Sequence, residues 1–169
     1  EYAVFGVELP LELWATLVGT TTPGAFEPYS WLESKIGKAL DREPLRARRR
    51  AVMMDLIAAE RPRPGIEDWL AGGRERGLNL AVASASRRPW VEQHLTNVAL
   101  IDRFDYLATG DQVERPKPAP DVYLLAARKL GIAPHEAIVI EDSRHGVAAA
   151  KAAGMFTIAV PNPMTAGLD

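Results

Sequence analysis

The sequence contains no cysteine in its 169 residues. Disulfide bridges and thiolate chemistry are therefore excluded, and the composition permits a reducing compartment, so we expect a cytoplasmic protein. No apolar run approaches the roughly 20 residues that a membrane helix needs, and no signal peptide is visible. With 20 basic and 22 acidic residues, neither sign of charge is in excess. We therefore expect neither a nucleic acid nor a membrane as a partner.

The residues that are present are typical of an ordinary soluble globular chain, with 47% hydrophobic and 25% charged residues. Apolar residues recur at helical spacing before residue 62, most clearly over 30–39 and 44–60. The segment Arg61-Pro-Arg-Pro-Gly65 interrupts this pattern, because two prolines and a glycine in five residues indicate a boundary. We therefore predict a helical domain over 1–62 and an α/β domain over 63–169.

Short apolar runs and helical stretches alternate in the second domain. Helices between consecutive strands indicate a parallel sheet with right-handed crossovers, so the predicted fold class is α/β with a Rossmann-like core. The runs that predict strands cover residues 78–83, 106–109, 137–140 and 157–160. The stretches that predict helices cover residues 66–76, 89–95, 121–130 and 144–153.

Polar residues follow two of the apolar runs. Glu141 and Asp142 come directly after Ala137–Ile140, which is wholly apolar and predicts a strand buried on both faces. Ser84 follows another run, and its hydroxyl with the next backbone N–H groups could hold an anion at a helix N-terminus. On sequence grounds, Ser84 could equally be only the N-cap of a helix, and so could Asp142 or Ser143.

Lys117 lies in a long loop between Pro116 and Pro118. The two prolines stiffen the backbone, which favours a fixed ammonium group, although a solvated loop lysine fits the pattern equally well. The carboxyl ends of parallel strands meet at one edge of a sheet, so these polar groups are expected to converge. A hydroxyl, a fixed cation and two carboxylates are what a site needs to hold a phosphoryl group beside a hard cation such as Mg²⁺.

Three stretches of the chain resemble known motifs. Leu80–Ser84, Gly110–Asp121 and Ile140–Gly146 are similar, in this order, to motifs II, III and IV of the haloacid dehalogenase-like hydrolase superfamily. The similarity is to the subfamily that contains beta-phosphoglucomutase and many small phosphatases. It implies that residues 63–169 form the Rossmann-like core of that fold and that residues 1–62 form its helical cap.

The resemblance also implies a function and a role for each residue. Ser84, with the backbone of Ala85, would bind the transferring phosphoryl group, and Lys117 would neutralise its charge. Asp142 would be a direct Mg²⁺ ligand, and Glu141 would support the metal. The protein would then be a Mg²⁺-dependent phosphohydrolase that acts on a small phosphorylated metabolite such as a sugar phosphate.

One family motif is missing from the sequence. Family members carry Asp-x-Asp at the end of a central first strand, where the first Asp attacks phosphorus, and no Asp-x-Asp occurs in these 169 residues. We therefore expect the native protein to have roughly 15–25 further N-terminal residues, the length of one strand and half a helix. A chain that starts at Glu1 should lack the central strand and the nucleophile, and should be inactive.

Other functions remain open at this point. A phosphomutase of the beta-phosphoglucomutase type would carry an arginine in the cap loop, and the corresponding segment, Gly19–Gly24, has none. A dehalogenase needs no metal, whereas this chain has the acidic pair. A phosphonatase more often has arginine where Lys117 stands. A binding module that kept the fold without catalysis is the alternative of a different class.

Overall fold

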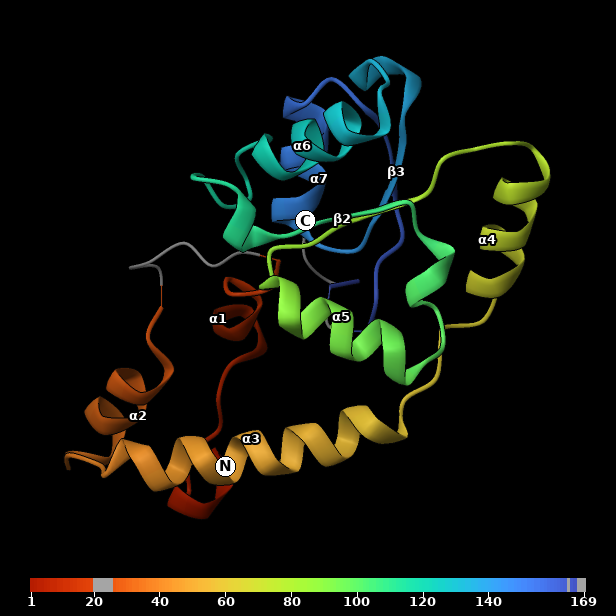
Figure 1. The fold of residues 1–169 in the computed structure, drawn as a ribbon. Coiled ribbons are helices and arrows are strands. Elements are labelled where there is room, and N and C mark those ends of the chain that lie inside the picture. The colour runs from red at the N-terminus through yellow and green to blue at the C-terminus, as the bar shows by residue number, and fades with distance from the viewer. Residues whose placement is uncertain (20–25, 164, 167–169) are drawn as a thin grey trace. The chain divides into compact units, whose positions relative to one another are not determined.

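The computed structural model describes the chain over residues 1–19, 26–163 and 165–166. Within these ranges, helices alone occur before residue 66, and helices alternate with parallel strands after it (Figure 1). The mixed α/β fold class predicted from the sequence is therefore confirmed. No helix in the described part of the chain is both long enough and apolar enough to cross a lipid bilayer.

Two compact units make up the chain. The first consists of Glu1–Leu17 and Pro23–Glu60, and the second of Val18–Thr22 and Arg61–Asp169. That residues 1–62 serve as a cap remains a prediction.

Helices η1 (Tyr2–Phe5), α1 (Leu11–Ala15), α2 (Pro28–Ile36) and α3 (Arg42–Ala59) form the first unit. Helix α2 begins where the Glu27 carboxylate accepts a hydrogen bond from the backbone N–H of Ser30, and proline at the first helical position needs no partner for its nitrogen. It ends at Gly37, which has a left-handed backbone. Its buried face is small, because Tyr29 and Leu32 are the residues of this helix that are removed from solvent.

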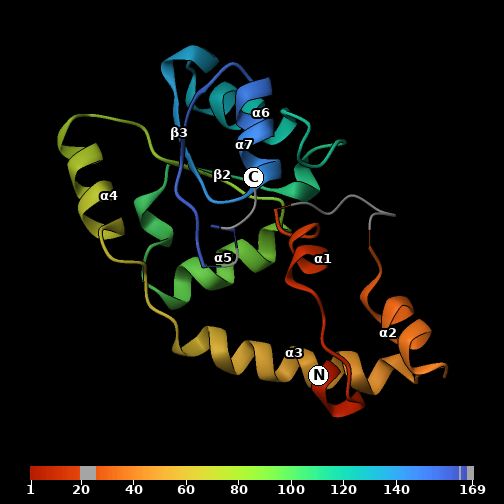
Figure 2. The same ribbon diagram turned by 180° about the vertical axis from the view of Figure 1, so that it is seen from behind.

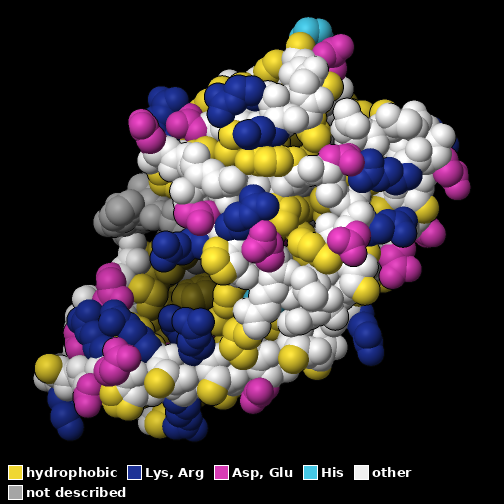
Figure 3. Space-filling view, in the orientation of Figure 1, with side chains coloured by type: hydrophobic (Ala, Val, Ile, Leu, Met, Phe, Trp, Pro, Cys, Tyr) yellow, Lys and Arg dark blue, Asp and Glu magenta, His cyan; other side chains and the backbone are white. Residues whose placement is uncertain are grey.

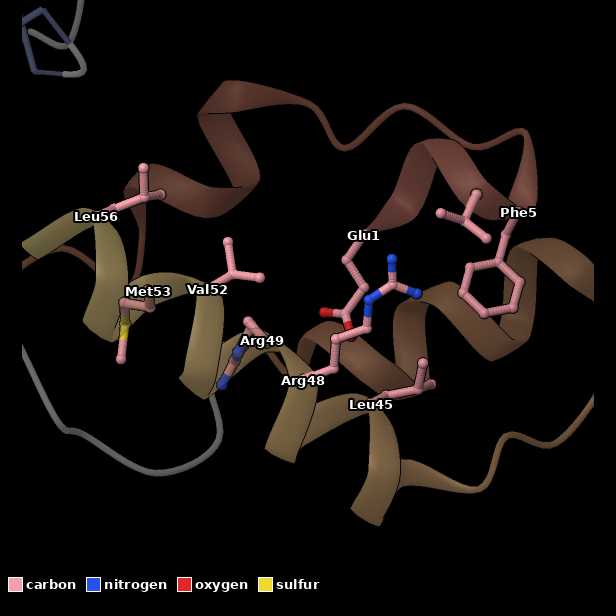
Figure 4. A pocket seen from close by; sticks show the side chains of 9 residues that line it. Glu1, Phe5, Leu45, Arg48, Arg49, Val52, Met53 and Leu56 are labelled. Carbon is pink, nitrogen blue, oxygen red and sulfur yellow. The ribbon is translucent and has the colours of Figure 1, made fainter.

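The apolar side of α3 is largely exposed. None of its residues is buried, and Val52 and Leu56 are more than half exposed. Together with η1, the helix lines a cavity of about 420 Å³, in which side chains of the two helices face each other (Figure 4). Arg48 and Arg49 also line this cavity, and Figure 3 shows basic side chains among hydrophobic ones on the surface of the molecule. The residues that line the cavity are Glu1, Val4, Phe5, Leu45, Arg48, Arg49, Val52, Met53 and Leu56.

The second unit is an alternation of helices and strands. Helix α4 precedes β1, helix α5 leads from β1 to β2, helix α6 leads from β2 to β3, and helix α7 leads from β3 to β4. The bounds are α4 Ile66–Glu75, β1 Ala81–Ala83, α5 Arg88–Asn97, β2 Tyr106–Ala108, α6 Asp121–Leu130, β3 Ile138–Glu141, α7 Arg144–Ala152 and β4 Phe156–Ala159. Each of these lies where the sequence predicts an element of that type.

The four strands form two separate pairs. Strand β1 pairs in parallel with β2, with Val82 opposite Leu107, and β3 pairs in parallel with β4, with Val139 opposite Thr157. Among the described residues, no strand joins the two pairs. That a further strand belongs between β1 and β3 stays a prediction.

The core of the second unit lies between the strands and two helices. Helix α6 packs against β1 and β2, helix α7 packs against β3 and β4, and the two helices lie side by side, as Figures 1 and 2 show from opposite directions. Ala149 and Ala150 of α7 are completely buried. Their side chains are small, so the helix can approach its neighbours closely. Val122, Tyr123 and Met155 complete the tightly packed part of this core.

The opposite face of the β3–β4 pair is open. Ile138 and Phe156, which are register partners, are each 65% exposed, and Ile140 is also exposed. The prediction that β3 is buried on both faces is therefore wrong for the described structure. The physical reason is that α6 and α7 cover one face only. The apolar side chains on the other face have no helix of the described residues packed over them.

Candidate active site

Ser84 lies just beyond the carboxyl end of β1. Its backbone N–H donates to the carbonyl of Ala108, 2.9 Å away, so the pairing with β2 continues to this residue. Its hydroxyl accepts a hydrogen bond from the N–H of Ser86 at 3.1 Å. Helix α5 begins later, with Arg87 as its N-cap, so Ser84 is not a helix cap.

The loop that follows Ser84 is packed tightly against the end of β2. The N–H of Gly110 donates to the carbonyl of Ser86, and a Cβ atom at Gly110 would come within 2.2 Å of the carbonyl oxygen of Ala85. Only a residue without a side chain fits there, because the obstacle is backbone that cannot swing away. The predicted phosphate-binding residues Ser84 and Ala85 therefore belong to a loop of fixed shape.

Lys117 is buried, with 4% of its surface exposed. Its ammonium Nζ donates to the carbonyl of Ala83 at 3.1 Å, to the hydroxyl of Tyr123 at 2.9 Å and to Oε2 of Glu141 at 2.7 Å. The solvated loop lysine that the sequence allowed is therefore excluded. The ammonium connects the carboxyl ends of β1 and β3, because it contacts both Glu141 and Ala83, the residue that precedes Ser84.

Glu141 accepts hydrogen bonds at both of its oxygens. Oε2 accepts from Lys117 and from the hydroxyl of Tyr123. Oε1 accepts from the backbone N–H of Asp142 and from both the N–H and the hydroxyl of Ser143, at 2.9–3.1 Å. A Cβ atom at Gly146 would lie 2.0 Å from the carboxyl carbon of Glu141, so this side chain fills its space completely.

The charges of this cluster support one another. Burial alone would raise the pKa of Glu141, but the Lys117 ammonium and hydrogen bonds from Lys117, Tyr123 and Ser143 outweigh it and lower the pKa to about 2. Burial, followed by the negative charge of Glu141, raises the pKa of Tyr123 far above its ordinary value. Glu141 is thus an anion and Tyr123 a neutral donor at any physiological pH.

Asp142 is the carboxylate of the pair that faces solvent. Its Oδ2 accepts a hydrogen bond from the side-chain amide of Asn162 at 2.7 Å. Ser143 caps α7 by accepting from the N–H of Gly146 at 3.0 Å, so Asp142 is not needed for that role. Of the two acids, Asp142 is therefore the one available to an external ligand.

The donor set is only partly that of a Mg²⁺ site. An exposed carboxylate such as Asp142 suits a hard cation that keeps several waters, whereas the oxygens of Glu141 already serve five donors. Among the described residues, no group of three or more His, Cys, Asp or Glu side chains is close enough to hold a metal ion. Asp142 fits as one ligand, and Glu141 fits better as a partner of Lys117.

The chain at Val18 and Gly19 also packs against this region. The Nδ1–H of His145 donates to the carbonyl of Val18 at 3.1 Å, and Gly19 has a φ of 79°. A Cβ atom at Gly19 would lie 2.2 Å from the hydroxyl oxygen of Ser143. Of the loop Gly19–Gly24, in which the sequence shows no arginine, only Gly19 lies within the described residues.

Two residues of the site escaped prediction from the sequence. Tyr123 stands on the apolar face of α6, where nothing in the spacing separates a hydrogen-bonding tyrosine from a core aromatic residue. Asn162 follows β4 between two prolines. A polar residue after a strand, at the same sheet edge as Asp142, was a signal that could have been used.

Comparison with known proteins gives one family. The model of the family described as haloacid dehalogenase-like hydrolase matches residues 10–160. YhcW of Bacillus subtilis (strain 168), whose name proposes a phosphatase, is 42% identical over 163 residues, which are 96% of this chain and 73% of that protein. Hexitol phosphatase B of Escherichia coli (strain K12) is 41% identical over 111 residues, which are 65% of this chain and 50% of that protein.

A solved structure supports the same comparison. The crystal structure of a hydrolase of this family from Deinococcus radiodurans R1, with bound phosphate and sodium, has a TM-score of 0.74 and 26% sequence identity. The similarity covers 95% of this chain and 70% of that one. The chain thus spans about three quarters or less of the proteins that it resembles here.

Proposed function

Because the chain belongs to the haloacid dehalogenase-like hydrolase family, we propose that its protein is a Mg²⁺-dependent phosphohydrolase of small phosphorylated metabolites. One observation carries this proposal more than any other. The ammonium of Lys117 is buried and held between the carbonyl that precedes Ser84 and the carboxylate that precedes Asp142. This cation contacts the residues that directly precede Ser84 and Asp142, and phosphoryl transfer depends on a fixed positive charge of this kind.

Each residue has a role in the proposed reaction. The hydroxyl of Ser84 and the backbone of Ala85 bind the phosphoryl oxygens, and Lys117 compensates the negative charge that builds up on them. Glu141 holds the ammonium of Lys117 in place from the other side. Asp142 provides an oxygen ligand for Mg²⁺, which when bound supplies further positive charge next to the phosphate.

The nucleophile is proposed to be an aspartate outside this chain. That carboxylate attacks phosphorus and forms an aspartyl-phosphate, while the alcohol of the substrate leaves; water then hydrolyses the intermediate and releases inorganic phosphate. Strand β1 has one edge that is not paired with β2, and β3 has one edge that is not paired with β4. A strand that carries this aspartate could pair with these two edges. Lys117 would lie beside it.

The substrate is proposed to be a phosphorylated sugar or sugar alcohol. The support is the relative whose name gives a hexitol phosphate as its substrate. No feature of the described residues favours a phosphomutase, and the segment that would decide, Thr20–Gly24, lies outside them.

Phosphate release in two forms of the protein tests the proposal. In the extended protein, meaning this chain joined to the proposed N-terminal segment that carries the nucleophile, we expect Mg²⁺-dependent turnover of hexitol and hexose phosphates. Asp142→Asn and Lys117→Met should each lower kcat/KM at least about 100-fold, as the loss of a charge-stabilising group does, with circular dichroism unchanged for Asp142→Asn.

Two controls make the test decisive. Asp102→Asn, at an exposed acid away from the cluster, should retain full activity. The 169-residue chain alone should give no turnover. Activity in this chain would refute an external nucleophile, and undiminished activity of Asp142→Asn would refute the metal assignment.

A further inference from the structure

The loop after β4 places a second polar side chain on Asp142. Asn162 lies between Pro161 and Pro163, and its side-chain Nδ2 donates to Oδ2 of Asp142 at 2.7 Å. Twenty residues separate the two in the chain, so the contact depends on the parallel pairing of β3 with β4. Within the described part of the chain, the hydrogen bonds to the carboxylate of Asp142 involve Oδ2 and not Oδ1.

The amide of Asn162 is held from behind by its own turn. The backbone N–H of Asn162 donates to the hydroxyl of Thr165 at 2.9 Å, and the N–H of Thr165 donates to Oδ1 of Asn162 at 3.2 Å. The N–H groups of Thr165 and Ala166 also donate to the carbonyl of Asn162. Because Oδ1 of Asn162 accepts from the turn, Nδ2 is the atom that faces Asp142.

The turn itself is anchored. Thr165 is 7% exposed, although it lies in a loop near the end of the described chain. Prolines on both sides of Asn162 restrict the backbone further. An exposed carboxylate normally rotates freely, so an amide held this firmly fixes one orientation of Asp142.

The chemical type of the partner is informative. An amide donates a hydrogen bond without bringing a positive charge, so it leaves the full negative charge of Asp142 available. A lysine or arginine in the same place would neutralise the carboxylate and compete with a cation. Metal-binding carboxylates are commonly oriented by such hydrogen-bonding partners, whose loss weakens metal binding by about 10- to 100-fold.

We propose that Asn162, held by Thr165, is a positioning residue that orients Asp142 for a divalent cation by occupying Oδ2 and leaving Oδ1 to the metal. This inference rests on the proposed function, because that proposal assigns the metal to Asp142. It adds a residue outside every stretch that carries the family resemblance.

Metal affinity measured directly is the test. In the extended protein, Mn²⁺ titrations followed by electron paramagnetic resonance, with inorganic phosphate present, give a Kd that does not depend on turnover. Asn162→Leu, which keeps the size of the side chain and removes the amide, should raise this Kd about 10- to 100-fold. In phosphate release, the Mn²⁺ concentration for half-maximal rate should rise by the same factor, while kcat at saturating Mn²⁺ changes less than threefold.

Thr165→Val separates positioning from a role in stability alone. It removes the hydroxyl that accepts from Asn162 but keeps the backbone N–H that holds Oδ1, so it should lower the thermal midpoint and change the Kd less than threefold. A Kd for Asn162→Leu equal to wild type, when Asp142→Asn abolishes binding, overturns the role of Asn162 and leaves the proposed function standing. If Asp142→Asn binds Mn²⁺ as wild type does, the metal assignment and this inference both fail.

Discussion

The buried pair of Lys117 and Glu141 makes the sharpest prediction about stability. Their charged atoms are 2.7 Å apart, and the side chains are only 5% and 11% exposed. Removing one member of a buried ion pair typically costs about 3–5 kcal/mol, because the remaining charge loses its counter-charge. Lys117→Met and Glu141→Gln should therefore each lower the free energy of unfolding by roughly this amount.

The double variant should lose much less than the sum of the two. Lys117→Met with Glu141→Gln removes both charges of the pair. The glutamine oxygen can still accept from Ser143, and its NH2 group can donate to the hydroxyl oxygen of Tyr123. We therefore expect a coupling energy of about 2–3 kcal/mol between the two positions, at the upper end of what contacting residues show.

Urea unfolding of the four proteins, followed by circular dichroism, measures this coupling. The matched control is the ion pair of Arg88 and Glu92 on α5, which has a similar distance of 2.8 Å but side chains that are 40% and 45% exposed. Its cycle should give no more than about 0.5 kcal/mol, because water screens the pair. If the Lys117 and Glu141 changes add within about 0.5 kcal/mol, the reasoning from burial is refuted.

Two further predictions concern single positions. Gly146→Ala should destabilise the protein by about 1–3 kcal/mol, because the new methyl group collides with Glu141. Gly72→Ala should instead stabilise its helix by up to about 1 kcal/mol, because the methyl group there meets only the flexible end of a side chain. Urea unfolding compares the two variants, and equal effects would contradict the packing argument. The pKa of Asp105 is lowered, and the main cause is the hydrogen bond from Arg74. The ionised carboxyl therefore stabilises the fold at pH values above its ordinary pKa of 3.8, and this stabilisation is lost as the pH falls through the lowered pKa. Unfolding free energies measured from pH 5 to pH 2.5 should fall less steeply for Asp105→Asn than for wild type, and identical slopes would rule this contribution out.

The elements of the second unit could be predicted because each has a strong local signal. Helix α6 occupies Asp121–Leu130, as its apolar spacing and the following glycine predict, and β3 begins within one residue of the predicted run. The burial of that strand could not be predicted in the same way. An apolar run shows which side chains a strand could bury. Whether helices cover one face of the strand or both depends on how the whole chain packs.

The candidate site shows the same division. The sequence identified Ser84, Lys117, Glu141 and Asp142 as polar groups at one sheet edge, and the structure brings Lys117 into contact with Glu141. It could not decide whether Lys117 was buried, because the deciding partner lies 24 residues later. The family resemblance gave Asp142 as the direct metal ligand and Glu141 as its support. That division stays a prediction, and the five hydrogen bonds accepted by Glu141 are compatible with it.

The position of Lys117 has a consequence for anyone who alters this protein by random mutation and selection. Its ammonium is bonded to a carbonyl of β1 and to a carboxylate of β3, so the group proposed to act on the substrate also fastens the two strand pairs to each other. A screen that measures only the loss of turnover would recover substitutions at Lys117. It would not distinguish loss of catalysis from loss of the folded structure. A screen that includes Lys117 therefore needs a measure of folding beside turnover to keep those two outcomes apart.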